Sequence, residues 1–299
     1  MDALPVDFIE RTIRHIQPLE PFQQLYGLWK EVPGNHFYVH GHLLLRVSPS
    51  TGADILSPIL LINDRRYELT VTLNMAECVQ LFEKYLRNGN FMEFSISIVG
   101  GFLQDLQRRP LESFPIIKLI LGNLHLIRSV GLCLEETDDC DLSHIYSYMR
   151  SPYDQFHTVT VRSKAENSFK ILRNVPKVSI LPMRKTWLIF ERSEIENLEY
   201  YWQLYEDPNV QQLELLGSQI AVPFLEKWKS TRAQKPLCKN VFFTGRINGR
   251  ISNVCKKVNE KRYTLLKRRK RIAAVFEKET DGKIKFYDCF FNKKTGCLI

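Results

Sequence analysis

The chain lacks most of the features that would place it in a special class of protein. No run of about 18 uncharged apolar residues is present, so a membrane-spanning helix is not predicted. Proline and glycine are ordinary at 14 residues each among 299, which excludes collagen-like and low-complexity chains. No Asn-x-Ser/Thr acceptor occurs, the first residues lack a secretory pattern, and the seven cysteines are odd in number and scattered. These absences predict an intracellular protein, cytoplasmic or nuclear, that does not contact a membrane.

Motifs that carry chemistry are also absent. The chain holds no GxxxxGK[ST] or GxGxxG phosphate loop, no GxSxG elbow and no HExxH helix. His36, His40 and His42 could supply three metal nitrogens, but no CxxC pair accompanies them. The acidic stretch at 135–141 lacks the central glycine and final glutamate of a calcium-binding EF-hand loop. We therefore expect no enzyme activity, no cofactor and no metal site; an active site assembled only in space is the enzymatic alternative.

What the chain does have is a local excess of positive charge. Eleven of its 42 Lys and Arg lie between Arg246 and Arg271 with a single acid, Glu260, although the net charge is only +9. Such a segment can contact nucleic-acid phosphates, act as a nuclear-import signal, or form a solvated helix face. Tyr263 is its only aromatic residue, whereas single-strand readers interleave aromatic and basic groups. The candidate basic patch comprises Lys256, Lys257, Lys261, Arg262, Lys267, Arg268, Arg269, Lys270 and Arg271.

The first 47 residues predict two or three short amphipathic helices. Apolar residues recur at helical spacing in two stretches that are separated by Pro18 and Pro21, and proline is tolerated only in the first turn of a helix. Helices this short have to bury their apolar stripe against something else. The stripe could bind a partner, or it could pack as a cap onto residues 39–47 and the strands that follow. Its members are Leu4, Pro5, Phe8, Ile9, Ile13, Ile16, Leu25 and Trp29.

Residues 48–245 alternate strand-like runs with helical stretches. Strands are predicted at 67–73, 91–99, 116–121, 130–134, 156–162, 175–181, 210–216 and 239–244. Helices are predicted at 76–87, 142–149, 165–173, 194–205 and 219–232. The strand starts recur at irregular intervals of mostly about 20 to 35 residues, which favours an irregular leucine-rich-repeat-like α/β array. A compact α/β domain with a single mixed sheet is the alternative.

The final part, residues 246–299, combines the basic segment with a predicted hairpin. Two alternating runs at 272–276 and 284–291 flank Asp281-Gly282, which is a strong hairpin-turn signal. We expect this antiparallel pair to cover the open end of the array, where backbone groups would otherwise be unpaired. The predicted organisation is a helical segment at 1–47, an α/β region at 48–245, and a basic segment with a hairpin cap at 246–299.

Two regions resemble the nematode F-box and F-box-associated families. The run from Leu4 to Val32 resembles an F-box, in which Leu-Pro opens the segment and a later helix ends in tryptophan. Residues 213–218, 224–229 and 235–237 (LELLGS, FLEKWK and KPL) resemble the C-terminal part of the F-box-associated families. The resemblance implies a non-catalytic substrate receptor of a Skp–cullin–F-box ubiquitin ligase, which binds a Skp-type adaptor and an unknown target protein. The alternative function is a nuclear nucleic-acid- or chromatin-binding protein that uses Arg246–Arg271.

Overall fold

The structure is a computed structural model of the chain, and it describes most of the residues from 39 to 290. The described ranges are 39–48, 54–63, 65–70, 72–87, 91–101, 108–149, 155–162, 166–174, 186–217, 219–231, 237, 239–244, 256–257, 262–267, 272–278 and 283–290.

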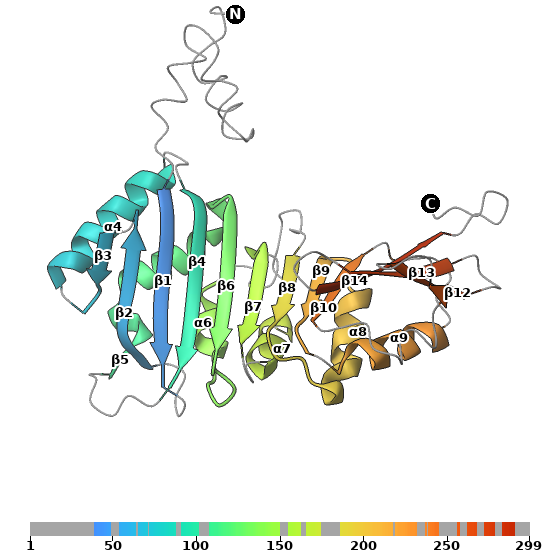
Figure 1. The fold of residues 1–299 in the computed structure, drawn as a ribbon. Helices are drawn as coiled ribbons and strands as arrows, with labels where there is room; N and C mark the ends of the chain where they lie inside the picture. Colours follow the sequence, from blue (N-terminus) through green and yellow to red (C-terminus); the bar gives the residue numbers. More distant parts are fainter. Residues whose placement is uncertain are drawn as a thin grey trace, which may run out of the picture.

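A run of parallel strands forms the centre of one large mixed sheet. These strands lie side by side in the order in which the chain makes them, and each is parallel to its neighbours (Figure 1). They are β1 (Val39–Val47), β4 (Phe91–Gly100), β6 (Ser129–Glu135), β7 (Thr158–Arg162), β8 (Thr186–Phe190), β9 (Val210–Leu215) and β10 (Asn240–Thr244).

Helices connect the consecutive parallel strands. Crossovers between parallel strands are almost always right-handed, so adding each new strand on the same side sends every helix to the same face of the sheet. Figure 1 shows the helices along one face. They are α4 (Thr72–Arg87), α5 (Pro115–Asn123), α6 (Ser143–Ser147), α7 (Glu166–Asn174), α8 (Leu198–Glu206) and α9 (Ala221–Ser230), with 3-10 turns η1 (Leu111–Ser113), η2 (Leu124–Leu126) and η4 (Ile195–Asn197).

The hydrophobic core lies between the sheet and these helices. Along each central strand, alternate side chains are buried, as in Val130, Leu132 and Leu134 of β6, because successive residues of a strand point to opposite faces. The buried strand residues join the buried helix residues in one continuous cluster. Toward the C-terminal end this cluster is rich in aromatic side chains, and Phe224 of α9 packs against Trp202 with ring centroids 5.2 Å apart. Helix packing therefore accounts for one face of the sheet only.

Antiparallel strands close both ends of the parallel array. At one end, β2 (Asp54–Ile62) pairs with β1, and β3 (Arg65–Glu68) and β5 (Arg108–Pro110) pair with different parts of β2. At the other end, the hairpin of β13 (Ile272–Lys278) and β14 (Lys283–Phe290) pairs through β14 with β10, and it continues into β12 (Arg262–Lys267) and β11 (Lys256–Lys257). The predicted hairpin and its position beside the last parallel strand are therefore confirmed.

Several expectations from the sequence are confirmed. The chain is an α/β protein, the strands at 91–99, 130–134, 210–216 and 239–244 form within a residue or two of their predicted bounds, and the predicted helices correspond to α4, α6, α7, α8 and α9. Among the described residues, no helix is both long and apolar enough to cross a bilayer.

Three structural expectations are corrected. Residues 116–121 form helix α5 instead of a strand: Pro115 occupies its first position, and Ile116, Ile117, Ile120 and Leu121 lie on one buried helical face. A short apolar run does not distinguish a strand from a buried helix by periodicity alone. The predicted strand at 67–73 is also wrong beyond its first residues, since β3 ends at Glu68 and α4 begins at Thr72.

The third correction concerns the N-terminal segment. Residues 39–47, which the sequence places in a helical segment, form β1 inside the sheet, where buried residues alternate with exposed or half-buried ones. The sequence places boundaries after residue 47 and after residue 245. Paired strands lie on the two sides of each of them, because β1 pairs with β2 and β10 pairs with β14. The rest of the predicted helical segment, residues 1–38, lies outside the described residues, and so does the predicted strand at 175–181.

Candidate functional site

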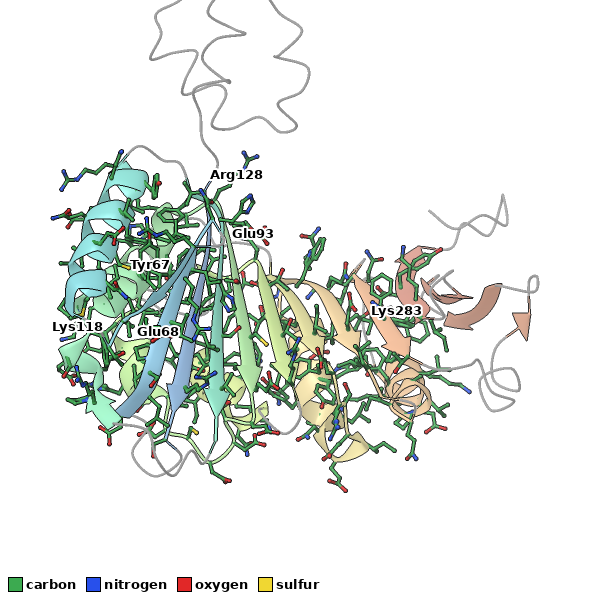
Figure 2. All side chains as sticks on the ribbon, turned by 60° about the vertical axis from the view of Figure 1, so that its left-hand side comes forward. Tyr67, Glu68, Glu93, Lys118, Arg128 and Lys283 are labelled. Carbon is green, nitrogen blue, oxygen red and sulfur yellow. The ribbon has the colours of Figure 1, made fainter. Side chains whose placement is uncertain are left out.

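The face of the sheet opposite the helices is the candidate site, and we call it the open face. Its side chains alternate along each strand with the buried ones and are exposed or half-buried. Figure 2 shows side chains on the strands across the width of the sheet, and it labels Glu93 and Lys283 of the open face. The residues of the open face are His40, His42, Leu44, Arg46, Glu93, Ser95, Ser97, Val99, Ser129, Gly131, Cys133, Glu135, Thr158, Thr160, Arg162, Trp187, Ile189, Gln212, Glu214, Asn240, Phe242, Thr244, Lys283, Lys285 and Tyr287.

From β4 to β8 the middle of the open face carries no charged side chain over two register rows. The parallel pairing aligns one residue from each strand in each row, as in Ser97, Cys133 and Thr160. We call these two rows the uncharged band. Its members are Ser95, Gly131, Thr158 and Trp187 in one row and Ser97, Cys133, Thr160 and Ile189 in the next.

Trp187 is the most unusual member of the band. Its side chain is 46% exposed, whereas Trp202 and Trp228 in the core are 5% and 1% exposed. The backbone amide of Trp187 donates to the carbonyl oxygen of His157 at 2.7 Å, which holds the residue in the sheet. The neighbour in register on β7 is the small residue Thr158. The large side chain of Trp187 is thus half-exposed beside a small neighbour.

A row of charges borders the band at the C-terminal ends of the strands. Arg162 lies between Glu135 and Glu191, with its Nη1 3.3 Å from Glu135 Oε2 and its Nε 3.1 Å from Glu191 Oε1. The negative charge of Cys133, once its thiol is ionised, and the carboxylates of Glu191 and Glu135 raise the pKa of Arg162. Because the three charged groups neutralise one another in part, this border presents paired charge.

Acidic side chains at the other limits of the band also have a basic residue beside them. At the N-terminal ends of the strands, His40 Nδ1 lies 3.7 Å from Glu93 Oε2. Beyond β8, Lys283 Nζ lies 2.8 Å from Glu214 Oε2. Glu93 and Lys283 lie far apart on β4 and β14 (Figure 2). The uncharged band is therefore framed by acids that already have a basic neighbour.

A hollow of about 480 Å³ lies beyond the C-terminal ends of β8 and β9 and is open to solvent. Its lining combines apolar side chains with charges of both signs. The one hydroxyl group in the lining is that of Ser193. Its Oγ donates a hydrogen bond to the backbone carbonyl oxygen of Phe190 at 3.3 Å. An added Cβ at Gly217 would lie 2.3 Å from the carbonyl oxygen of Ser193, which is why glycine is needed where these two loops meet. The lining residues are Arg192, Ser193, Glu194, Ile195, Glu196, Leu216, Gly217 and Gln219.

The thiols of Cys78, Cys133 and Cys140 are not activated as nucleophiles. Burial raises the pKa of Cys78 to about 12 and that of Cys140 to about 11, and it also raises the pKa of Cys133. A thiolate is the reactive form of cysteine, so these groups are less reactive than a free thiol at neutral pH.

Of the three histidines considered as metal ligands, the structure describes His40 and His42. His42 Nε2 lies 3.0 Å from Ser97 Oγ, and burial lowers the pKa of His42. His40 faces Glu93, and His36 lies outside the described residues. In the described part of the chain, no group of three or more His, Cys, Asp or Glu side chains is placed to hold a metal ion.

Lys239 is a buried lysine with a shifted pKa. Its Nζ donates to the carbonyl oxygen of Tyr205 at 2.7 Å and to that of Asp207, both at the C-terminal end of α8. Burial lowers the pKa of Lys239 to about 8, and the carboxylates of Asp207, Asp288 and Glu206 oppose this shift. A cation that binds the last carbonyls of a helix stabilises the helix end. The geometry thus gives Lys239 a structural role that joins α8 to β10.

The two sets of residues selected from the sequence are only partly placed. The apolar stripe from Leu4 to Trp29 lies outside the described residues. In the basic patch, Lys256 and Lys257 form β11, and Arg262 and Lys267 are the first and last residues of β12. Register places Lys257 opposite Tyr263 and Arg262 opposite Glu277. These four basic residues belong to strands, so a solvated helix face is excluded for them. Lys261, Arg268, Arg269, Lys270 and Arg271 lie outside the described residues.

The sequence did not single out Trp187 or predict strand β8. The strand consists of Thr186–Phe190, a run of five residues in which both faces carry apolar side chains. Such a run hides the alternation that marks a half-exposed strand. The available signal was the long stretch between the end of helix α7 at Asn174 and the start of helix α8 at Leu198, which leaves room for a strand of the array.

Comparisons with known proteins do not assign the chain to a family. No protein-family model matches it, and no curated protein or solved structure matches it either. The open face is therefore interpreted from its own geometry.

Proposed function

We propose that the protein is a non-catalytic interaction module that binds a target protein on the open face of its sheet. The observation that carries the proposal is the uncharged band, in which a half-exposed tryptophan lies among small polar side chains. Tryptophan is enriched where protein interfaces are most buried, and an aromatic side chain that stays exposed in a free protein is available for such burial.

The arrangement of the strands supports a repeat-like architecture. Parallel strands that neighbour one another in chain order, with helices on one face, resemble a leucine-rich-repeat array with degenerate repeats. Repeat proteins of this kind use their extended sheet face to bind partners. The irregular leucine-rich-repeat-like array expected from the sequence therefore remains our interpretation of the fold.

We further propose that the module acts as a substrate receptor of a Skp–cullin–F-box ubiquitin ligase. This part of the proposal depends on the resemblance of residues 4–32 to an F-box. In such an assembly the adaptor binds the N-terminal apolar stripe, the sheet holds the target, and other subunits carry out the chemistry. A receptor of this type needs no catalytic residues of its own.

Co-purification with a purified Skp-type adaptor tests adaptor binding. We expect the wild-type chain to bind the adaptor and the double variant Ile9→Asp/Ile13→Asp to lose binding, because two charges would have to be buried in an apolar contact. The double variant Glu10→Gln/Arg14→Gln changes the same segment outside the stripe and serves as the matched control. Failure of the wild type to bind, or equal binding by the aspartate variant, would refute the ligase proposal and leave a scaffold without an adaptor.

A second candidate function is supported by the concentration of positive charge at one end of the sheet. The segment Arg246–Arg271 contains 11 basic residues and one acid, and part of it forms β11 and β12. A protein that uses this segment on nucleic acid would show binding that falls steeply as salt increases. Titration of duplex and single-stranded DNA, with Lys267–Arg271 changed to Gln as the control, distinguishes the two functions. Weak binding that does not depend on these residues would remove this candidate.

A further inference from the structure

We propose that the uncharged band binds a target segment that has no charged side chains at the contact and inserts one large apolar side chain beside Trp187. This inference rests on the proposed function, because it names the part of the open face that binds and the chemistry of what is bound. Trp187 and Ile189 are the apolar side chains of the band at its β8 end, and they follow each other on one face of the same strand.

The band consists of a stretch of small residues that is bordered on one side by the indole of Trp187. Across β4, β6 and β7 the band consists of two serines, a glycine, a cysteine and two threonines, which are small and leave the sheet accessible. At β8 the side chain becomes a half-exposed indole, and Gln212 follows in register on β9. A bulky side chain that lies on the small residues therefore meets the indole from one side. Offset or edge-to-face contact between aromatic groups is favourable in this arrangement.

The electrostatics disfavour a charged occupant of the band. Burying a charge is costly unless it finds a partner, and the nearest acids already have basic neighbours. Arg162 lies between Glu135 and Glu191, and Glu214 Oε2 is 2.8 Å from Lys283 Nζ. A basic target side chain would have to displace Arg162 or Lys283 to pair with one of these acids. An uncharged segment needs no such exchange, so the charge pattern selects for it.

The edges of the sheet do not compete with the face as a binding site for an extended peptide. Strand β3 is four residues long, and Arg65, Arg66 and Glu68 on it are exposed, which is how proteins protect an edge from pairing. Strand β5 covers another part of β2 and ends at Pro110, which has no amide hydrogen to donate. At the opposite end, β11 comprises two residues. The side chains of the open face are thus left as the recognition surface.

A selection from a phage library of short random peptides on the purified full chain tests the inference. We expect the selected peptides to share an uncharged core with one aromatic or large aliphatic residue. Their affinity should fall about tenfold or more for Trp187→Ala and only slightly for Trp187→Phe, because the ring is the anchor. Leu126→Ala is the matched control, since Leu126 is 56% exposed and lies outside the open face in η2. It should bind the peptides as the wild type does.

A second measurement reports on the band directly. Trp187→Phe removes one indole, so the difference between its fluorescence and that of the wild type isolates the emission of Trp187. We expect a selected peptide to shield this emission from acrylamide. A synthetic version of the peptide with lysine or aspartate in place of its apolar anchor should neither bind nor shield.

Either of two results would overturn the inference: selection of charged peptides, or peptide binding that is equally strong in Trp187→Ala. An absence of any selected peptide would also count against it. These results are independent of adaptor binding. If the adaptor co-purifies but the peptides bind Trp187→Ala as tightly as the wild type, the inference fails and the ligase proposal stands. If the peptides depend on Trp187 but no adaptor binds, the ligase proposal fails and the band remains a binding surface.

Discussion

The two faces of the same sheet differ in what they contribute. In β6, Val130, Leu132 and Leu134 on the covered face are buried, whereas Gly131 and Cys133 on the open face are only half-buried. A strand of seven residues therefore supplies both core and surface, because its side chains alternate. The difference teaches that burial in the core is concentrated on one face of the sheet, while the other face presents side chains to its surroundings.

The largest expected difference between the faces concerns aromatic side chains. Phe224→Ala should lower the free energy of unfolding by about 3–5 kcal/mol, since it leaves a cavity in an aromatic cluster. Trp187→Ala on the open face should change it by less than about 1 kcal/mol. Urea unfolding of the two variants makes the comparison, and equal losses would show that both faces carry the fold. The rings that pack on Phe224, with centroids 5.2–5.6 Å away, belong to Trp202, Tyr205, Phe243 and Phe286.

The same substitution at two glycines sharpens the comparison. A Cβ at Gly41 on the covered face would lie 2.3 Å from the ring of Phe94, whereas a Cβ at Gly131 on the open face meets nothing within 4 Å. Because Phe94 is fully buried, Gly41→Ala should cost about 1–3 kcal/mol of stability through overpacking. Gly131→Ala should be neutral or gain up to about 1 kcal/mol, because alanine restricts the unfolded chain. The midpoint temperatures of thermal unfolding of both variants measure this difference. A lower midpoint for Gly131→Ala than for the wild type would contradict the assignment of an open face.

Titration of Lys239 tests how the covered side accommodates a charge. Its pKa is lowered to about 8 in the fold from an ordinary value of 10.5, so between these values the unfolded chain binds more protons. The contribution of Lys239 to the free energy of unfolding should therefore rise as the pH increases from 8 toward 10.5. The stability of wild type relative to Lys239→Met should increase by about 1 kcal/mol between pH 7 and pH 9.5. A difference that stays constant or falls with pH would show that burial does not control this group.

The smallest effect is expected at the charged border of the open face. Arg162→Ala removes two ion pairs of exposed groups, and such pairs are worth about 0–1 kcal/mol each. We expect a loss below about 1 kcal/mol in low salt that largely disappears at high salt, because exposed charges are screened. Arg66→Ala, which removes one exposed pair with Glu68 on an edge strand, is the matched control. A loss as large as that of Phe224→Ala would mean that the border belongs to the structural core.

The sequence predicts those parts of the fold in which local pattern and tertiary environment agree. Alternation predicts β4 and β6 almost to the residue, and Asp281-Gly282 between two alternating runs predicts the β13–β14 hairpin. The run at 116–121 is mistaken for a strand because an apolar stretch of this length is compatible with a strand or a buried helix. In the structure it belongs to helix α5, in the layer that covers the sheet. Strand β8 is missed for the same reason, and the candidate site at Trp187 is missed with it.

The sequence by itself determines the α/β class, the alternation along the strands, the terminal hairpin and the concentration of positive charge near the C-terminal end. It does not determine which of the two faces of each strand is covered. That choice is made in the tertiary structure, because the crossovers all turn in one direction and carry every helix to one side of the sheet. Trp187 and Leu188 are neighbours with similar apolar character, yet one is 46% exposed and the other 1% exposed. The period of a strand separates them, and only the position of the helices decides which one remains available to a partner.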